Sequence, residues 1–146
     1  MSKKIFLFFW ISFFFNSVSF ATLDSISIQL VTGRGIVNFH VELAVTQKQR
    51  ERGLMNRSFL SDNAGMLFVW DQEVIEEFWM KDTPISLDIV FLDQYKNIIS
   101  IVPNTTPYSL VPIRCPTPFR YVLEVKGGRM GSLKAKPGNK ILFDGV

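Results

Sequence analysis

Alternation of apolar and polar residues dominates the chain after its first twenty-three positions. Over 24–45, apolar side chains recur at every second position on either side of a Thr32-Gly33-Arg34-Gly35 turn. This period of two predicts a pair of strands that share one apolar face. Continuous apolar runs predict buried strands at 65–70 and 87–92, with a turn at 71–73. Further strands are expected at 98–102, 120–126 and 140–143.

Little of the chain is expected to be helical. Thr46 is placed to cap a short helix, with Gln49 three residues later to complete a capping box and Gly53 where the helix should end. A single helical turn is expected at 129–133. Residues 103–118 hold five prolines and show no periodicity, which predicts a long ordered loop. Seven or so short strands with little helix favour a β sandwich or barrel.

The first twenty-one residues have the pattern of a secretory signal peptide. Lys3 and Lys4 precede an apolar segment over 5–15, and Ser19-Phe20-Ala21 fits a small-x-small cleavage site. A transmembrane anchor needs about 20 apolar residues, and polar residues interrupt this run too early for one. The sequence therefore predicts export to the periplasm or beyond, followed by a single β domain over 22–146 with no membrane span.

Removal of this leader changes the charge of the protein. The full chain has 16 Lys and Arg against 13 Asp and Glu, and loss of Lys3 and Lys4 leaves 14 against 13. A net charge near +1 gives no basis for nucleic-acid binding, which relies on many contacts from Lys and Arg to phosphates. Cys115 is the only cysteine, which excludes an internal disulfide and a cysteine-only zinc site. No glycine-rich phosphate loop occurs either, and no cofactor is expected.

Residues 78–91 are the stretch richest in groups that could contact a ligand. Phe78-Trp79-Met80 precedes a Lys81-Asp82-Thr83 turn, and Asp88 follows inside an apolar run. An aromatic wall with a few convergent polar groups is typical of small-molecule sites. Aromatic residues also fill β cores, so a simple connecting turn is the competing interpretation.

Three acids interrupt apolar strands: Glu42, Asp88 and Glu124. Carboxyl groups whose pKa values are separated by burial can serve as acid and base, so a hydrolase that uses Asp88 and Glu124 is one hypothesis. Exposure to water or a structural ion pair is the more common arrangement, since an isolated buried charge is costly. Arg52 and Arg57 are the expected partners of Asp88.

The methionines suggest a Cu(I) site, because thioethers are soft ligands that select this ion. Met55, Met66, Met80 and Met130 share no ligand spacing, however, and His40 is the only histidine. Methionine is in general a core residue. No metal site is therefore predicted, and no cysteine–histidine nucleophile either.

Several of these motifs occur in an order that resembles domain-of-unknown-function family 192. The matching segments are Glu42-Leu43-Ala44 with Thr46, Glu51 to Arg57, Gly65 to Val69, Phe78 to Thr83 with Leu87-Asp88-Ile89, Tyr121 to Val125 with Gly127 or Gly128, and Pro137-Gly138. The resemblance implies a jelly-roll-like β sandwich with one or two short helices, and it implies no catalytic residues. Asp82 stands where the family usually has Asn, which would add a negative charge to a pocket at this turn.

The sequence thus predicts an exported, mainly β module, a jelly-roll-like sandwich or barrel, that binds a small ligand or an envelope protein without catalysis. The hydrolase is the alternative. The candidate ligand-binding residues are Arg52, Met55, Arg57, Trp79, Lys81, Asp82, Thr83, Asp88 and Glu124.

Overall fold

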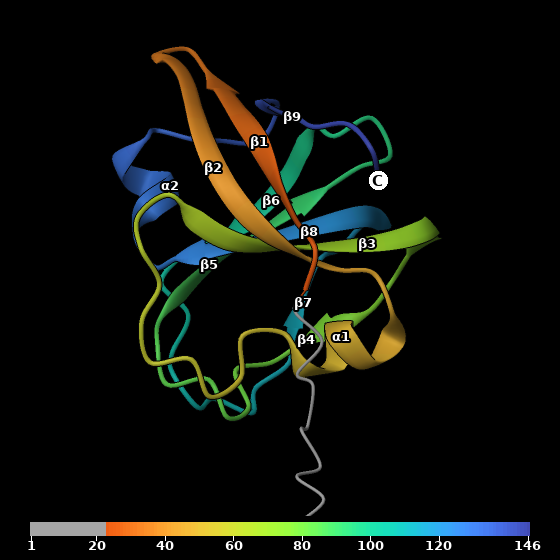
Figure 1. Cartoon of the computed structure of the whole chain (residues 1–146), viewed down its shortest axis with the longest axis vertical. Helices are drawn as coiled ribbons and strands as arrows, with labels where there is room; N and C mark the ends of the chain where they lie inside the picture. The colour runs from red at the N-terminus through yellow and green to blue at the C-terminus, as the bar shows by residue number, and fades with distance from the viewer. Residues whose placement is uncertain (1–22) are drawn as a thin grey trace, which may run out of the picture.

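The computed structural model describes residues 23–146, which form a curled sheet with two short helices (Figure 1). The leader predicted over 1–21 lies outside the described residues. In chain order the elements are β1 (Ser25–Thr32), β2 (Gly35–Ala44), α1 (Gln47–Arg52), β3 (Ala64–Val74), β4 (Glu77–Phe78), β5 (Leu87–Leu92), β6 (Ile98–Val102), β7 (Ile113–Arg114), β8 (Phe119–Lys126), α2 (Arg129–Ser132) and β9 (Lys140–Leu142). The prediction of a mainly β fold with one or two short helices is confirmed. Within residues 23–146, no helix is long and apolar enough to cross a membrane.

Seven strands form one sheet in the order β6-β5-β8-β3-β2-β1-β9, and β4 pairs separately with β7. The two edge strands meet at one end of the sheet. There the Ile98 N–H donates to the Asn139 carbonyl at 2.8 Å, and the Ile141 N–H donates to the Lys96 carbonyl at 3.0 Å. The sheet therefore curls into a half-barrel, which is the barrel form of the predicted architecture.

The parallel pairing of β2 with β3 places α1 beside the sheet. Parallel neighbours need a long crossover, and residues 45–63 supply it with α1 inside. The predicted capping box is confirmed, because the Thr46 hydroxyl accepts from the Gln49 N–H at 3.2 Å and the Gln49 side chain accepts from the Thr46 N–H at 2.8 Å. Gly53 ends the helix at a φ of 47°, where a side chain would be strained. In Figure 1, α1 lies on the same side of β3 and β8 as β4 and β7.

The central strands β3, β5 and β8 are buried on both faces, which explains their continuous apolar runs. One cluster fills the inside of the half-barrel and includes Phe39, Leu67, Val90, Leu123 and Met130. The second cluster lies on the opposite face of the same strands and includes Leu54, Phe68, Trp70, Phe91 and Phe119. Alternate residues of each strand therefore belong to different cores.

Two boundaries differ from the sequence prediction. The turn expected at 71–73 is wrong, because β3 continues to Val74. These polar residues are exposed, and the pairing with β8 changes register between Val69 and Val74, so a bulge accommodates them. The loop predicted at 103–118 contains β7, whose two residues pair with β4.

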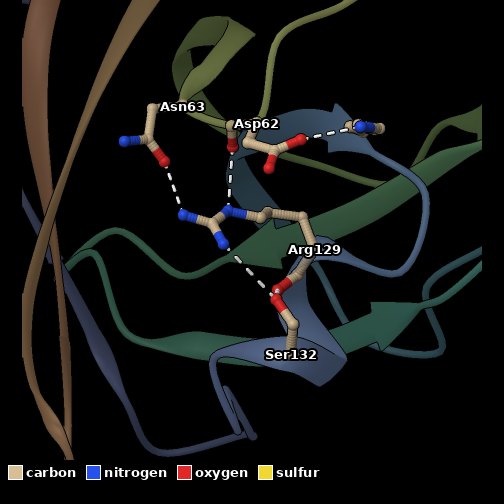
Figure 2. Close-up of polar contacts among 5 residues, drawn as sticks. Asp62, Asn63, Arg129 and Ser132 are labelled. Carbon is tan, nitrogen blue, oxygen red and sulfur yellow. Dashed lines mark hydrogen bonds and ion pairs between the residues drawn. The ribbon is translucent and has the colours of Figure 1, made fainter.

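Arg129 attaches α2 to the end of the crossover (Figure 2). Its guanidinium donates to the Asp62 carbonyl at 2.9 Å and to the Asn63 side chain at 2.5 Å. Lys126 Nζ lies 2.7 Å from the Asp62 carboxylate, and this hydrogen bond lowers the pKa of Asp62. The contacts fix the chain entering β3 against the chain leaving β8.

Gly65 allows β3 to approach β8 closely, and Gly65→Ala is expected to destabilise the fold by about 1–3 kcal/mol. A Cβ at this position would overlap the Glu124 carbonyl oxygen and press on the Val125 side chain. Urea unfolding measures the loss. Gly131→Ala is the control, since a Cβ there meets nothing within 4 Å. Equal stability of the two variants would contradict this close approach of the strands.

Candidate functional site

A cavity of about 450 Å³ lies between α1 and the central strands. Its walls come from α1 and the turn after it, from β3, from the segment around β4 and from single residues of β5 and β8. The lining residues are Gln47, Arg50 to Met55, Phe68, Trp70, Glu76 to Met80, Thr83, Leu87 and Glu124. The volume falls within the range of small-molecule sites, about 300–1,000 Å³.

Arg50 fixes the helical wall of this cavity against the sheet. Its guanidinium donates to the Val45 carbonyl at 2.6 Å and to the Val69 carbonyl at 2.9 Å. The same group lies over Trp70, with Cζ 4.9 Å from the ring centroid. Leu54 lies just beyond the end of α1, after Gly53, and is buried in the second core beside the sheet. No residue of α1 itself is buried, so this polar helix is held against the sheet by Arg50 and by the Leu54 that follows it.

Aromatic side chains form the opposite wall. Phe78 packs edge-on against Phe68 and Trp70, with ring centroids 5.6 and 6.2 Å apart. The Trp70 indole donates to the Glu76 carboxylate at 3.1 Å. Trp79 follows Phe78 and is 54% exposed, so it lies at the rim of the cavity.

Glu124 is the buried titratable residue of the cavity. It is 5% exposed and projects from the β8 face that carries Val122, towards the second core. Its carboxyl group makes no hydrogen bond or ion pair with residues 23–146, and its oxygens remain open to the cavity rather than fully enclosed. Burial raises its pKa from 4.5 to about 8. At neutral pH the group is therefore mostly protonated and can both donate and accept a hydrogen bond.

Asp88 is fully buried but serves a structural role on the other face of the sheet. Its carboxylate accepts from the Asn104 and Gly128 N–H groups at 2.8 Å each and from the Met130 N–H at 2.7 Å. The predicted ion pair with Arg52 or Arg57 is therefore wrong. Three backbone donors replace the arginine, because β5 passes beside the start of α2 and the loop after β6.

Asp88 and Glu124 cannot act together as the acid and base of a hydrolase. They lie on neighbouring strands, where Ile89 pairs with Glu124 and Asp88 pairs with Val125. Paired residues point to the same face, so Asp88 and Glu124 point to opposite faces. The predicted pair is corrected on this ground.

Arg57 also lies outside the cavity. It makes a bidentate ion pair with Glu42, at 2.5 and 2.9 Å between nitrogen and oxygen atoms. Both side chains are about one-third exposed. This pair ties the crossover to β2, so Arg57 and Glu42 satisfy each other.

Only part of the Lys81-Asp82-Thr83 turn lines the cavity. Asp82 has a φ of 52°, a conformation that Asn and Asp tolerate better than most residues, which accounts for either one at this position. Thr83 lines the cavity, and its hydroxyl donates to the Lys81 carbonyl at 3.0 Å. Lys81 lies over the rim, with Nζ 5.6 Å from the Trp79 ring centroid.

The structure thus divides the nine candidate residues into two groups. Those that line the cavity are Arg52, Met55, Trp79, Thr83 and Glu124. Those that do not are Arg57, Lys81, Asp82 and Asp88. Sequence reasoning missed Arg50, Phe68, Trp70 and Glu76 as site residues, and it named Phe78 only as part of the ligand-rich stretch. None of the four gave a distinctive signal, since each looked like an ordinary core or surface position.

The methionines and Cys115 do not form a shared centre. Met55 and Met80 line the cavity, whereas Met130 belongs to the core inside the half-barrel. Cys115 is a buried free thiol whose sulfur lies 3.7 Å from the Thr117 hydroxyl. Within 23–146, no group of three His, Cys, Asp or Glu side chains is arranged to hold a metal ion.

The sequence model of domain-of-unknown-function family 192 (DUF192), whose description is Uncharacterized ACR, matches residues 28–143. The chain belongs to this family. No curated protein matches this DUF192 chain. The family match extends from β1 to the residue after β9, so it includes every segment that lines the cavity.

Two solved structures are similar to this DUF192 domain. One is a proposed transcription regulator from Sinorhizobium meliloti, with 34% identity, a TM-score of 0.81 and coverage of 83% of this chain and 95% of that one. The other is a protein of unknown function from Novosphingobium aromaticivorans, with 33% identity, a TM-score of 0.82 and coverage of 86% and 89%. Both agree with the curled, mainly β fold.

Proposed function

We propose that this DUF192 chain is an exported module that binds a small molecule in the cavity between α1 and the sheet. The observation that carries the proposal is Glu124, a side chain only 5% exposed that lines the cavity, whose carboxyl group makes no hydrogen bond or ion pair with residues 23–146 and keeps its oxygens open to the cavity. Buried polar groups in proteins are nearly always hydrogen-bonded. Because the carboxyl oxygens of Glu124 stay open to the cavity, a ligand bound there can supply a hydrogen-bond partner.

The walls support binding rather than catalysis. Phe68, Trp70 and Phe78 offer apolar and aromatic surface, and the buried polar side chains of Thr83 and Glu124 can orient a ligand. This combination is how small-molecule sites are usually built. A second buried carboxylate would be needed for the acid and base of a hydrolase, and Asp88 faces away from the cavity.

Export is part of the proposal because of the leader pattern in the first twenty-one residues. A cavity that faces the extracytoplasmic space would sample nutrients, envelope components or signalling molecules. The single cysteine is compatible with an oxidising compartment, since it leaves no intramolecular pair to form.

Native mass spectrometry of the protein purified from its own host tests both parts. We expect a mature chain that begins at Thr22 and carries a reproducible additional small mass. Met55→Trp should abolish the additional mass, because the larger side chain fills the cavity that Met55 lines. Phe59→Trp is the matched control, since Phe59 is 72% exposed on the same crossover and lies outside the cavity.

Three outcomes would contradict the proposal. An intact leader would overturn cleavage and export of the mature module. A bare mass in the wild type would overturn retention of a small molecule. An added polypeptide mass that both variants keep would show a protein partner that binds elsewhere.

A further inference from the structure

We infer that the ligand of this cavity carries an ammonium group, which sits between the aromatic wall and Glu124. This inference rests on the proposed function and specifies the chemical class of the ligand. It stands on three observations: the aromatic wall, the balance of charged groups and the position of the unpartnered carboxyl group.

The walls are suited to a cation. Phe68, Trp70, Phe78 and Trp79 all line the cavity, and the faces of such rings attract positive charge. Two of these rings already contact a positively charged side chain of the protein, since Arg50 lies over Trp70 and Lys81 lies over Trp79. An ammonium group is attracted to such a wall, whereas a carboxylate is repelled by the ring faces.

Acidic groups outnumber basic ones in the lining. The charged residues that face the cavity are Arg50, Glu51 and Arg52 from α1, Glu76 and Glu77 from the segment at β4, and Glu124 from β8. Arg50 is occupied by two backbone carbonyls, which leaves Arg52 as the cation without such contacts. When Glu124 is ionised, as a bound ammonium group favours, the lining holds four acids against two bases, so a cation balances its charge better than an anion does.

The partners of these acids single out Glu124. Glu76 accepts from the Trp70 indole, and Glu77 pairs with Arg114 at 2.6 Å. The carboxyl group of Glu124 makes no hydrogen bond or ion pair with residues 23–146, and its oxygens are open to the cavity. A carboxylate ligand beside Glu124 would place two acids together, which disfavours ionisation of both. An ammonium group instead supplies donors and a compensating charge.

Ionisation of Glu124 should accompany binding. Alone in the cavity it holds its proton at pH 7, because its pKa is raised to about 8 by burial. An ammonium group beside it favours the charged form and lowers that pKa. Binding of a cation at pH 7 therefore releases a proton to the buffer, whereas binding of a neutral molecule does not.

Isothermal titration calorimetry with three probes of similar size tests the inference: phenethylamine, phenethyl alcohol and phenylpropionate. We expect phenethylamine to bind at least roughly tenfold tighter than the other two. Its binding heat should differ between phosphate and Tris buffers by the amount that corresponds to release of close to one proton. Affinity for the amine should rise from pH 6 to 8, while affinity for the alcohol should stay constant.

Two variants test whether binding of the amine takes place in the cavity or elsewhere on the surface. Glu124→Gln should remove both the preference for the amine and the proton release. Glu73→Gln should leave both unchanged, because Glu73 is exposed and does not line the cavity. Circular dichroism confirms that each variant is folded before titration.

The outcomes distinguish this inference from the proposed function. Equal or tighter binding of the alcohol or the carboxylate would overturn the ammonium class and leave ligand binding intact. Amine binding that persists in Glu124→Gln would overturn the role of Glu124. Absence of binding by all three probes would overturn the inference, while the mass of the protein purified from its host decides the proposed function independently.

Discussion

Asp88→Asn is expected to destabilise this DUF192 domain by roughly 3–5 kcal/mol, because Asp88 holds three buried backbone donors. Two of them, at Asn104 and Gly128, donate to Oδ1, and the third, at Met130, donates to Oδ2. An asparagine amide keeps one acceptor oxygen but turns an NH₂ group towards one set of N–H donors. The charge that strengthens all three bonds is lost as well.

Urea unfolding of the wild type and the variant at pH 7 measures this effect. Asp71→Asn is the matched control, since Asp71 is exposed on β3 and makes no ion pair or side-chain hydrogen bond with residues 23–146. A change within about 0.5 kcal/mol is expected for the control. An Asp88→Asn variant as stable as the control would show that the network around α2 contributes nothing.

The second large effect is a dependence of stability on pH that Glu124→Gln removes. The pKa of Glu124 is about 8 in the folded chain against 4.5 for the free side chain. Between these values the unfolded chain has released its proton and the folded chain retains it. The free energy of unfolding therefore falls as pH rises, by up to about 1.4 kcal/mol per pH unit.

The sign can be checked at the two limits. Below pH 4.5 both states are protonated, so the stability that comes from neutral Glu124 is fully present there. It is lost as the pH rises through about 8, and above that value the fold contains a buried charge. At pH 9 Glu124→Gln should therefore be more stable than the wild type by several kcal/mol, and at pH 5 the two should be close.

Urea unfolding at pH 5, 7 and 9 measures this difference. Glu73→Gln serves as the control and should follow the wild type, because Glu73 is exposed. Parallel pH profiles for Glu124→Gln and the wild type would mean that water or another group solvates the carboxylate, and the picture of a desolvated cavity would fail.

Glu124 and Asp88 show where sequence reasoning reached its limit. Both are acids in apolar strands, and local pattern alone places them together as candidates for one acid–base pair. Their roles differ because neighbouring positions in paired strands alternate between faces, and the register of β5 against β8 sends one into each core. That register depends on contacts over the whole sheet, so a local pattern could not supply it.

The interpretation of the arginines failed for the same reason. Opposite charge predicts an ion pair between Asp88 and Arg52 or Arg57. In the fold, the crossover instead brings Arg57 to Glu42 on β2. Arg50 is one of several polar residues on α1 in the sequence. In the structure its guanidinium donates to the carbonyls of Val45 and Val69 and so fixes the cavity wall. Both outcomes follow from segments that are close in space and distant in sequence.

What the sequence determined by itself was local. The strand at Leu87–Leu92, the hairpin to Ile98–Val102, and the Thr46 and Gln49 cap are all set by side-chain period, turn residues or contacts within a few residues. Tertiary structure alone decided that the sheet curls, that α1 and β4 help to enclose a cavity, and that Glu124 faces it without a hydrogen bond to any residue of 23–146. The physical reason is that burial, pKa and hydrogen-bond partners depend on groups brought together from across the chain, which no local pattern specifies.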